Sequence, residues 1–159
     1  MDKVKVGNSA QTTAALGFII EPVKDLKFST DYRYAENLYG NISPQNFSSE
    51  AAGKLGALKL PAFYLLDLGV SYKFNLNKKQ YFTIRGNVYN LFDKVYIAEA
   101  NTNIHANSSA AQYAVNSGNS SATAYNTYVQ QGNWNGVSQQ NQVFFGFGRT
   151  WTTTLSFNF

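Results

Sequence analysis

The C-terminal segment from Thr150 to Phe159 alternates strictly between two kinds of side chain, and this limits the folds open to the chain more than any other feature. One face of the segment is mainly bulky and apolar, and it carries Trp151, Thr153, Leu155, Phe157 and Phe159. The other face is small and polar, and it carries Thr150, Thr152, Thr154, Ser156 and Asn158. A period of two is that of a β-strand and not of a helix. The absence of Lys and Glu from the polar face favours a strand between lipid and a polar lumen over one in a soluble sandwich.

The same alternation occurs in four earlier segments, 12–20, 26–34, 66–74 and 82–88. Short turns follow Ile20 and Phe74, whereas long polar stretches follow Tyr34 and Phe92. Short turns at one end and long loops at the other are typical of outer-membrane barrels. The sequence therefore predicts an all-β fold, an antiparallel meander of about five long strands that is part of a transmembrane β-barrel. Its long extracellular loops span about 36–62 and 97–142.

The alternation also predicts which residues face each other, because a slip of one residue would move every side chain to the opposite face. Phe18 is expected across from Phe28, and Val70 across from Gly86. The parity changes near Asn90-Leu91, where a β-bulge is expected.

The overall composition fits a membrane barrel and excludes several other classes. Aromatic residues make up 16% of the chain and charged residues 14%, yet the mean hydropathy is −0.29. No apolar run reaches the roughly 18 residues that a transmembrane helix needs. The net charge of +4 is spread along the chain, so no nucleic-acid partner is predicted. There is no cysteine, which excludes disulfides and thiolate metal sites.

Few residues suggest catalysis or metal binding. Asp31, Asp67 and Asp93 are interpreted as charges that face the lumen, and His105 is the only histidine, so a zinc site is not expected. The sequence predicts neither an enzyme nor a cofactor.

The ends of the last strand are expected to lie at the two membrane interfaces. Ten residues at about 3.4 Å each, tilted by about 45°, rise roughly 24 Å, close to the apolar thickness of such barrels. Arg149 would then extend its guanidinium to the far interface, with Trp151 in an aromatic girdle just below it. Phe157 and Phe159 are expected at the periplasmic interface, and outer-membrane lipid is the predicted surrounding.

The second long loop offers one candidate ligand surface. From Ala100 to Gly148 there is no Asp, Glu, Lys or Arg. Within this stretch, amides and hydroxyls surround Tyr113, Tyr125, Tyr128 and Trp134. Such side chains can stack on sugars or other neutral ligands. An ordinary surface loop is the preferred interpretation.

Three segments together resemble the TonB-dependent receptors. The segment Leu60 to Phe74 resembles a strand of that family that begins with Leu-Pro-aromatic. Asn90-Leu91-Phe92-Asp93-Lys94, followed by Val95 and Tyr96, is similar to the core of the penultimate strand, and Gly148-Arg149-Thr150-Trp151 leading to Phe159 is similar to the last strand.

The resemblance implies a 22-stranded barrel with an N-terminal plug in the outer membrane of a Gram-negative bacterium. Such a receptor imports a scarce ligand of the siderophore, cobalamin or carbohydrate type with energy relayed by the TonB complex. The terminal Phe159 looks like the signal read by the barrel-assembly machinery.

The sequence departs from this family because the plug, the TonB-contacting segment and most strands are missing. The start, Met1 to Gly7, also lacks the apolar region of a secretory signal. Residues 1–159 are therefore expected to be the C-terminal segment of a receptor barrel whose remaining strands and plug lie elsewhere in a parent chain. Two alternatives stay open, namely a small oligomeric outer-membrane porin or adhesin barrel, and a soluble ligand-binding β-barrel.

Overall fold

The computed structural model of the chain describes residues 5–42, 56–77, 79–105 and 133–159. The chain divides into two compact units. The sheet unit comprises Thr13–Ala35, Phe63–Val95 and Phe147–Phe159, and the loop unit comprises Met1–Thr12, Glu36–Ala62 and Tyr96–Gly146. The described residues contain strands and turns but no helix, and therefore none that is long and apolar enough to cross a membrane.

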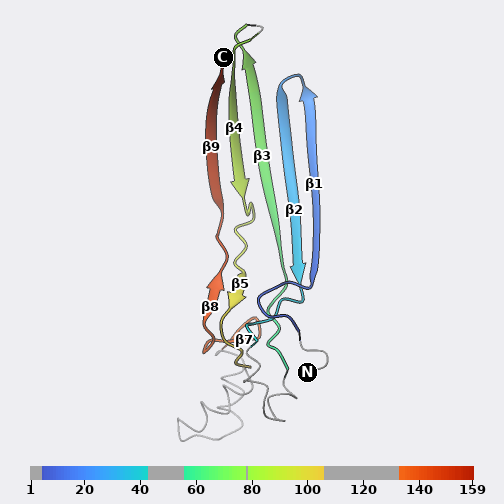
Figure 1. Ribbon diagram of the computed structural model, residues 1–159, viewed down its shortest axis with the longest axis vertical. Helices are drawn as coiled ribbons and strands as arrows, with labels where there is room; N and C mark the ends of the chain where they lie inside the picture. The colour runs from blue at the N-terminus through green and yellow to red at the C-terminus, as the bar shows by residue number, and fades with distance from the viewer. Residues whose placement is uncertain (1–4, 43–55, 78, 106–132) are drawn as a thin grey trace, which may run out of the picture. The chain divides into compact units, whose positions relative to one another are not determined.

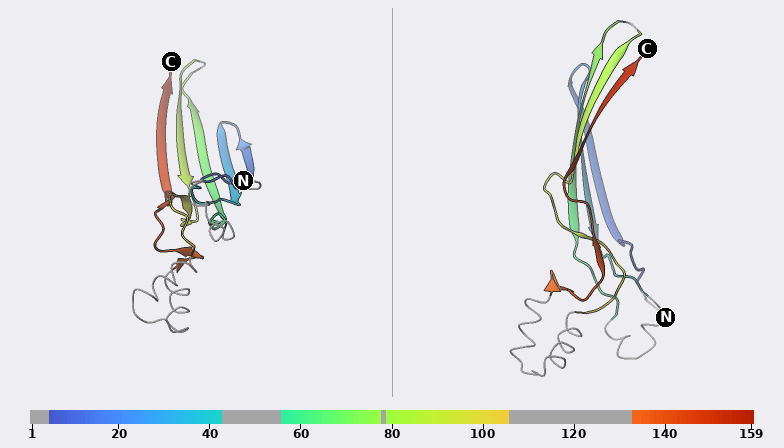
Figure 2. Two further views of the ribbon diagram at one scale, coloured as in Figure 1. Left: turned by 60° about the horizontal axis from the view of Figure 1, so that its bottom comes forward. Right: turned by 90° about the vertical axis from the view of Figure 1, so that its left-hand side faces the viewer.

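The sheet unit is built on a five-stranded meander, as the sequence predicts. Its strands lie side by side in the order β1-β2-β3-β4-β9 and alternate in direction (Figure 1). Their bounds are β1 (Thr12–Val23), β2 (Leu26–Glu36), β3 (Phe63–Asn75), β4 (Tyr81–Tyr89) and β9 (Thr150–Asn158). The right-hand view of Figure 2 shows the strands twisting relative to one another, as L-residues require. The all-β class and the antiparallel meander are thus confirmed.

The register of the strands brings the apolar residues of β2, β3, β4 and β9 onto one face. Phe28 pairs with Val70, Val70 with Gly86 and Gly86 with Thr153. The predicted pairing of Val70 with Gly86 is therefore confirmed, while the pairing of Phe18 with Phe28 stays a prediction. In β1, a Cβ on Gly17 would meet Oδ1 of Asp31 at 2.6 Å. Gly17 and Asp31 therefore share the polar face, which leaves Phe18 on the opposite one.

Both short turns are held by side chains near their tips. At the first turn, Asp25 adopts a φ of 70°, and its N–H donates a 2.9 Å hydrogen bond to Oε1 of Glu21. At the second turn, Oδ1 of Asn77 accepts hydrogen bonds from the N–H groups of Lys79 and Gln80, at 2.9 Å and 2.8 Å. Asx side chains are favoured in turns because they replace such backbone contacts.

The predicted β-bulge near Asn90-Leu91 is wrong. Strand β4 ends at Tyr89, and Asn90 has a φ of 50°, so the chain leaves the sheet here instead of continuing with an extra residue. The change of parity marks the end of the strand. An irregularity of register lies instead between Ile97 and Glu99, in the pairing of β5 (Ile97–Ala100) with β8 (Val143–Phe145).

The described part of the loop unit contains four short strands and a small apolar core. Strand β5 (Ile97–Ala100) pairs with β8 (Val143–Phe145), and β6 (Asn133–Trp134) pairs with β7 (Val137–Ser138). The buried apolar residues of this unit come from segments far apart in the sequence: Leu38, Leu58, Leu60, Ile97, Ala100 and Val137. The second long loop is therefore partly built into regular structure.

A glycine is required where β8 ends, because an aromatic ring lies on its backbone. A Cβ at Gly146 would overlap Cζ and Oη of Tyr96, and the Gly146 N–H donates a 2.9 Å hydrogen bond to the Tyr96 carbonyl. We expect Gly146→Ala to lower the free energy of unfolding by about 1–3 kcal/mol, as overpacking does. Urea unfolding of the full chain in detergent micelles measures this. The matched control is Gly86→Ala, whose Cβ would meet only Cγ1 of Val70 at 3.7 Å. A Gly146→Ala midpoint equal to that of the control would contradict the contact.

Candidate functional site

The apolar face of the sheet unit is exposed although it is rich in large side chains. Phe28, Ile84 and Leu155 remain 42%, 42% and 69% exposed. Phe82 packs on Phe157 across the β4–β9 pair, with 4.6 Å between the ring centroids. Monomeric soluble proteins rarely expose a contiguous apolar surface larger than a few hundred Å². A face of this kind is typical of surfaces that contact lipid or another protein.

The polar face of the sheet unit carries charged and small side chains in cross-strand rows. One row pairs Asp31 with Asp67. The next contains Ser29, Gly69, Asn87 and Thr152, and the one after that contains Lys27, Ser71, Arg85 and Thr154. A cavity of about 350 Å³ is lined on this face by Asp31, Arg33 and Asp67 among others. A second cavity of about 260 Å³ is lined by Lys27, Ser71 and Arg85 among others. Ser29 and Asn87 line both cavities, so the two cavities adjoin at these residues, and together they are called the groove.

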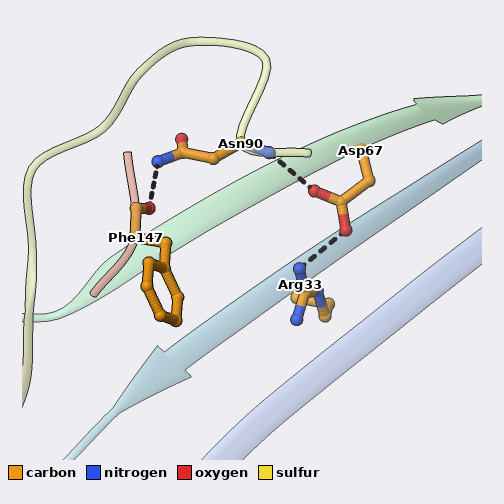
Figure 3. A network of polar contacts seen from close by, with 4 residues as sticks. All are labelled: Arg33, Asp67, Asn90 and Phe147. Atoms are coloured by element: carbon orange, nitrogen blue, oxygen red, sulfur yellow. Dashed lines mark hydrogen bonds and ion pairs between the residues drawn. The ribbon is translucent and has the colours of Figure 1, made fainter. Parts of the chain in front are cut away.

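A polar network connects three strands at one end of the groove (Figure 3). Nη2 of Arg33 lies 2.6 Å from Oδ2 of Asp67, in an ion pair whose carboxylate is only 13% exposed. Oδ1 of Asp67 accepts a 2.8 Å hydrogen bond from the backbone N–H of Asn90. Both oxygens of Asp67 are therefore engaged, and this carboxylate joins β2, β3 and the end of β4.

Asn90 is the centre of a turn that connects β4 to the start of β9. Its side chain is buried, with the residue 4% exposed. Nδ2 donates hydrogen bonds to the carbonyls of Lys94 and Phe147, at 3.0 Å and 3.1 Å, and Oδ1 accepts one from the Lys94 N–H at 2.8 Å. The backbone φ of 50° favours Asn among the non-glycine residues. One side chain thus satisfies three backbone groups in two segments.

Asp93 connects the same turn to the residue that precedes β9. It too has a positive φ, of 51°, and its Oδ1 accepts a 2.7 Å hydrogen bond from the Arg149 N–H. The Lys94 ammonium lies 5.5 Å from the centroid of the Tyr64 ring. The segment Asn90-Leu91-Phe92-Asp93-Lys94 is therefore a structural clamp between β3, β4 and β9.

The predicted interface residues lie on or next to β9. Trp151 and Phe157 are on the apolar face, opposite Val88 and Phe82 respectively, and Phe159 follows the strand and is 93% exposed. Arg149 precedes the strand, and its Nη1 lies 3.5 Å from the Leu91 carbonyl. Their roles at a membrane interface and in assembly stay predictions.

The predicted ligand surface of the second long loop falls mostly outside the described residues. Tyr113, Tyr125 and Tyr128 lie in 106–132, which the structure does not describe. Trp134 is half-buried and packs edge-to-face on Phe145, with ring centroids 5.4 Å apart. Its ring thus contributes to the packing of the loop unit, and a ligand role for it stays a prediction.

Asp31 and Asp67 are cross-strand partners, whereas Asp93 lies in the turn after β4 and His105 lies in another segment of the chain. Asp67 and Asp93 are engaged by the clamp, while Nε2 of His105 lies 3.1 Å from the Gly56 carbonyl. Within the described ranges, no group of three or more His, Cys, Asp or Glu side chains could hold a metal ion. The sequence did not reveal the roles of Asn90 and Asp67. Asn90 was visible only as the first residue of the motif Asn90-Leu91-Phe92-Asp93-Lys94, and Asp67 only as a polar residue of an alternating strand.

Comparisons of this chain with protein-family models, with curated proteins and with solved structures found no match.

Proposed function

We propose that this chain forms part of the wall of an outer-membrane β-barrel of the TonB-dependent receptor type, with its apolar face toward lipid and its polar face toward the lumen. In this role it contributes barrel wall and loops to a transporter that imports a scarce ligand. Further strands and a plug of the same parent chain complete the barrel.

One observation carries the proposal. The register of the four adjacent strands β2, β3, β4 and β9 brings large apolar side chains together on a face that stays exposed, and small polar and charged ones on the other. Lipid satisfies the first face and a water-filled lumen satisfies the second.

The dimensions of the strands support the same role. Strands β3 and β9 contain 13 and 9 residues. With a rise of about 3.4 Å per residue and a tilt of about 45°, they span roughly 31 Å and 22 Å, which brackets the apolar band of about 25 Å. The two edges, β1 and β9, present unpaired backbone groups in the sheet described here, and in lipid these groups need partner strands.

Fluorescence quenching by brominated lipids tests the orientation of the sheet. In a Trp134→Phe background, Trp151 becomes the only tryptophan, since the chain contains two. We expect strong quenching of Trp151 in vesicles whose acyl chains carry bromine, because its side chain is 75% exposed on the apolar face. The matched control is the triple variant Trp134→Phe, Trp151→Phe, Thr152→Trp, which moves the fluorophore to the polar face.

The two outcomes separate the proposal from its alternatives. Quenching of Trp151 at least twofold stronger than that of the position-152 variant supports a lipid-facing apolar surface. Equal quenching at both positions, or a chain that stays in buffer as a monodisperse monomer without detergent, contradicts the proposal and favours a soluble ligand-binding barrel.

A further inference from the structure

The groove on the polar face of the sheet unit has uncompensated charges of opposite sign at its two ends. At one end, Asp31 and Asp67 are direct cross-strand partners, so two carboxylates lie side by side, an arrangement that destabilises a sheet unless a cation compensates it. Arg33 pairs with Asp67. No hydrogen bond or ion pair joins Asp31 to any described residue, so one negative charge at this end stays uncompensated.

The opposite end of the groove carries two cations, and only one of them has an anionic partner among the described residues. Lys27 and Arg85 flank Ser71 in one cross-strand row. Nζ of Lys27 lies 3.8 Å from Oε2 of Glu21, and both side chains are about half exposed, so solvent weakens this pair. Arg85 has no hydrogen-bond or ion-pair partner among the described residues.

The floor between the two ends is uncharged. Gly69 lies between Ser29 and Asn87 in the middle row, and a Cβ there would meet Oδ1 of Asn87 at 2.8 Å. A Cβ there would also meet Oγ of Ser29, so the side chains of Ser29 and Asn87 come together over Gly69 and form the polar floor at this point. The hydroxyl of Ser29 and the amide of Asn87 offer hydrogen bonds to polar groups of a bound molecule.

The spacing of the ends defines what can bridge them. The row of Lys27 is four residues from the row of Asp31, which is about 14 Å along a strand. Long Lys and Arg side chains can shorten the distance between the charged groups to about 10 Å, the length of three extended residues. A single amino acid is too short to reach both ends.

We propose that this groove binds an extended dipolar molecule, with an ammonium group against Asp31 and a carboxylate between Lys27 and Arg85, and that a tripeptide with free termini is the simplest member of this class. Its peptide groups lie over the side chains of Ser29 and Asn87, within hydrogen-bonding reach of both. The proposal rests on the polar face alone and is independent of whether the apolar face contacts lipid.

The test is a titration of the full chain in detergent micelles at low salt with trialanine, N-acetyl-trialanine and trialanine amide, followed by the NMR shifts of the Gly69 and Asn87 amides. We expect millimolar binding of trialanine, and binding about three- to fivefold weaker for each blocked peptide, the size expected for an exposed ionic contact. Added salt should reduce the preference for free termini, because it screens exposed charges.

Variants assign each terminus to its end of the groove. In Asp31→Asn, N-acetylation should no longer weaken binding, and in Arg85→Gln the effect of amidation should shrink. Lys73→Gln is the matched control, because Lys73 is a cation of the same face that lies over the Tyr81 ring, 4.0 Å from its centroid, and lines neither cavity. This variant should bind trialanine as the unchanged protein does.

Three results would overturn the proposal. They are equal binding of the three peptides by the unchanged protein, survival of the preference for a free amino terminus in Asp31→Asn, and the absence of any shift at Gly69 and Asn87. None of these results bears on the lipid-quenching experiment, so failure of the groove and failure of the membrane role remain distinguishable.

Discussion

Replacing Asn90 by alanine is expected to lower the free energy of unfolding by about 3–5 kcal/mol. The side chain makes three hydrogen bonds to backbone groups while buried, and each such group left unsatisfied costs about 1–3 kcal/mol. Alanine at a φ of 50° adds about 1–2 kcal/mol of steric strain. The expected total is smaller than the plain sum of these terms, because a local shift of the turn recovers part of the loss and single substitutions rarely cost more than about 4–5 kcal/mol. Urea unfolding of the full chain in detergent micelles measures the change.

Two further variants separate the hydrogen bonds from the backbone strain. Asn90→Gly removes the same hydrogen bonds but tolerates the positive φ, so it should be about 1 kcal/mol less damaging than alanine. Asn87→Ala is the control for loss of an amide from β4, since Asn87 makes one 3.3 Å contact with Thr152 and should cost under about 1 kcal/mol. An Asn90→Ala protein as stable as Asn87→Ala would show that the clamp is not what holds β4 to β9.

Placing arginine on the two faces of β9 should give opposite results in lipid. Leu155 pairs with Ile84 on the apolar face, and Ser156 pairs with Thr83 on the polar face. Leu155→Arg is expected to destabilise the lipid-inserted protein by about 2–4 kcal/mol, the effect of a cation near the bilayer midplane, whereas lumen substitutions are tolerated. Ser156→Arg, at nearly the same depth, should change stability by less than about 1 kcal/mol.

The measurement is reversible urea unfolding of the chain folded into phosphatidylcholine vesicles. The pair of variants has the same charge and nearly the same position, so the difference between them reports the face alone. A larger loss from Ser156→Arg would reverse the assignment of lipid and lumen. Equal small losses would mean that neither face contacts hydrocarbon.

The five long strands could be predicted from the sequence because their side chains alternate without interruption. In β3, Leu66, Leu68 and Val70 occupy every second position, and any other register would move them to the polar face. The pairing of Val70 with Gly86 follows from this constraint and from the short turn between the strands. Periodicity is a local signal, and here the tertiary structure agrees with it.

The clamp and the loop unit could not be predicted in the same way, because they depend on contacts between distant segments. Asn90 reaches Phe147, and Asp67 reaches both Arg33 and Asn90. No periodicity indicates such pairs. The change of parity after Tyr89 did signal a break, but a bulge and a strand end produce the same pattern in one sequence. The groove likewise depends on the cross-strand rows and not on any continuous motif.

The buried apolar core of the loop unit has a consequence for the order in which the protein folds. Its residues come from segments as far apart as Leu38 and Val137, so its contacts have a high sequence separation and a large loop-closure entropy. Pairing of Ala35 with Phe63 and of Tyr89 with Thr150 brings the ends of these segments together in advance. We therefore expect the core of the loop unit to form late, after these two strand pairs have joined the ends of its segments.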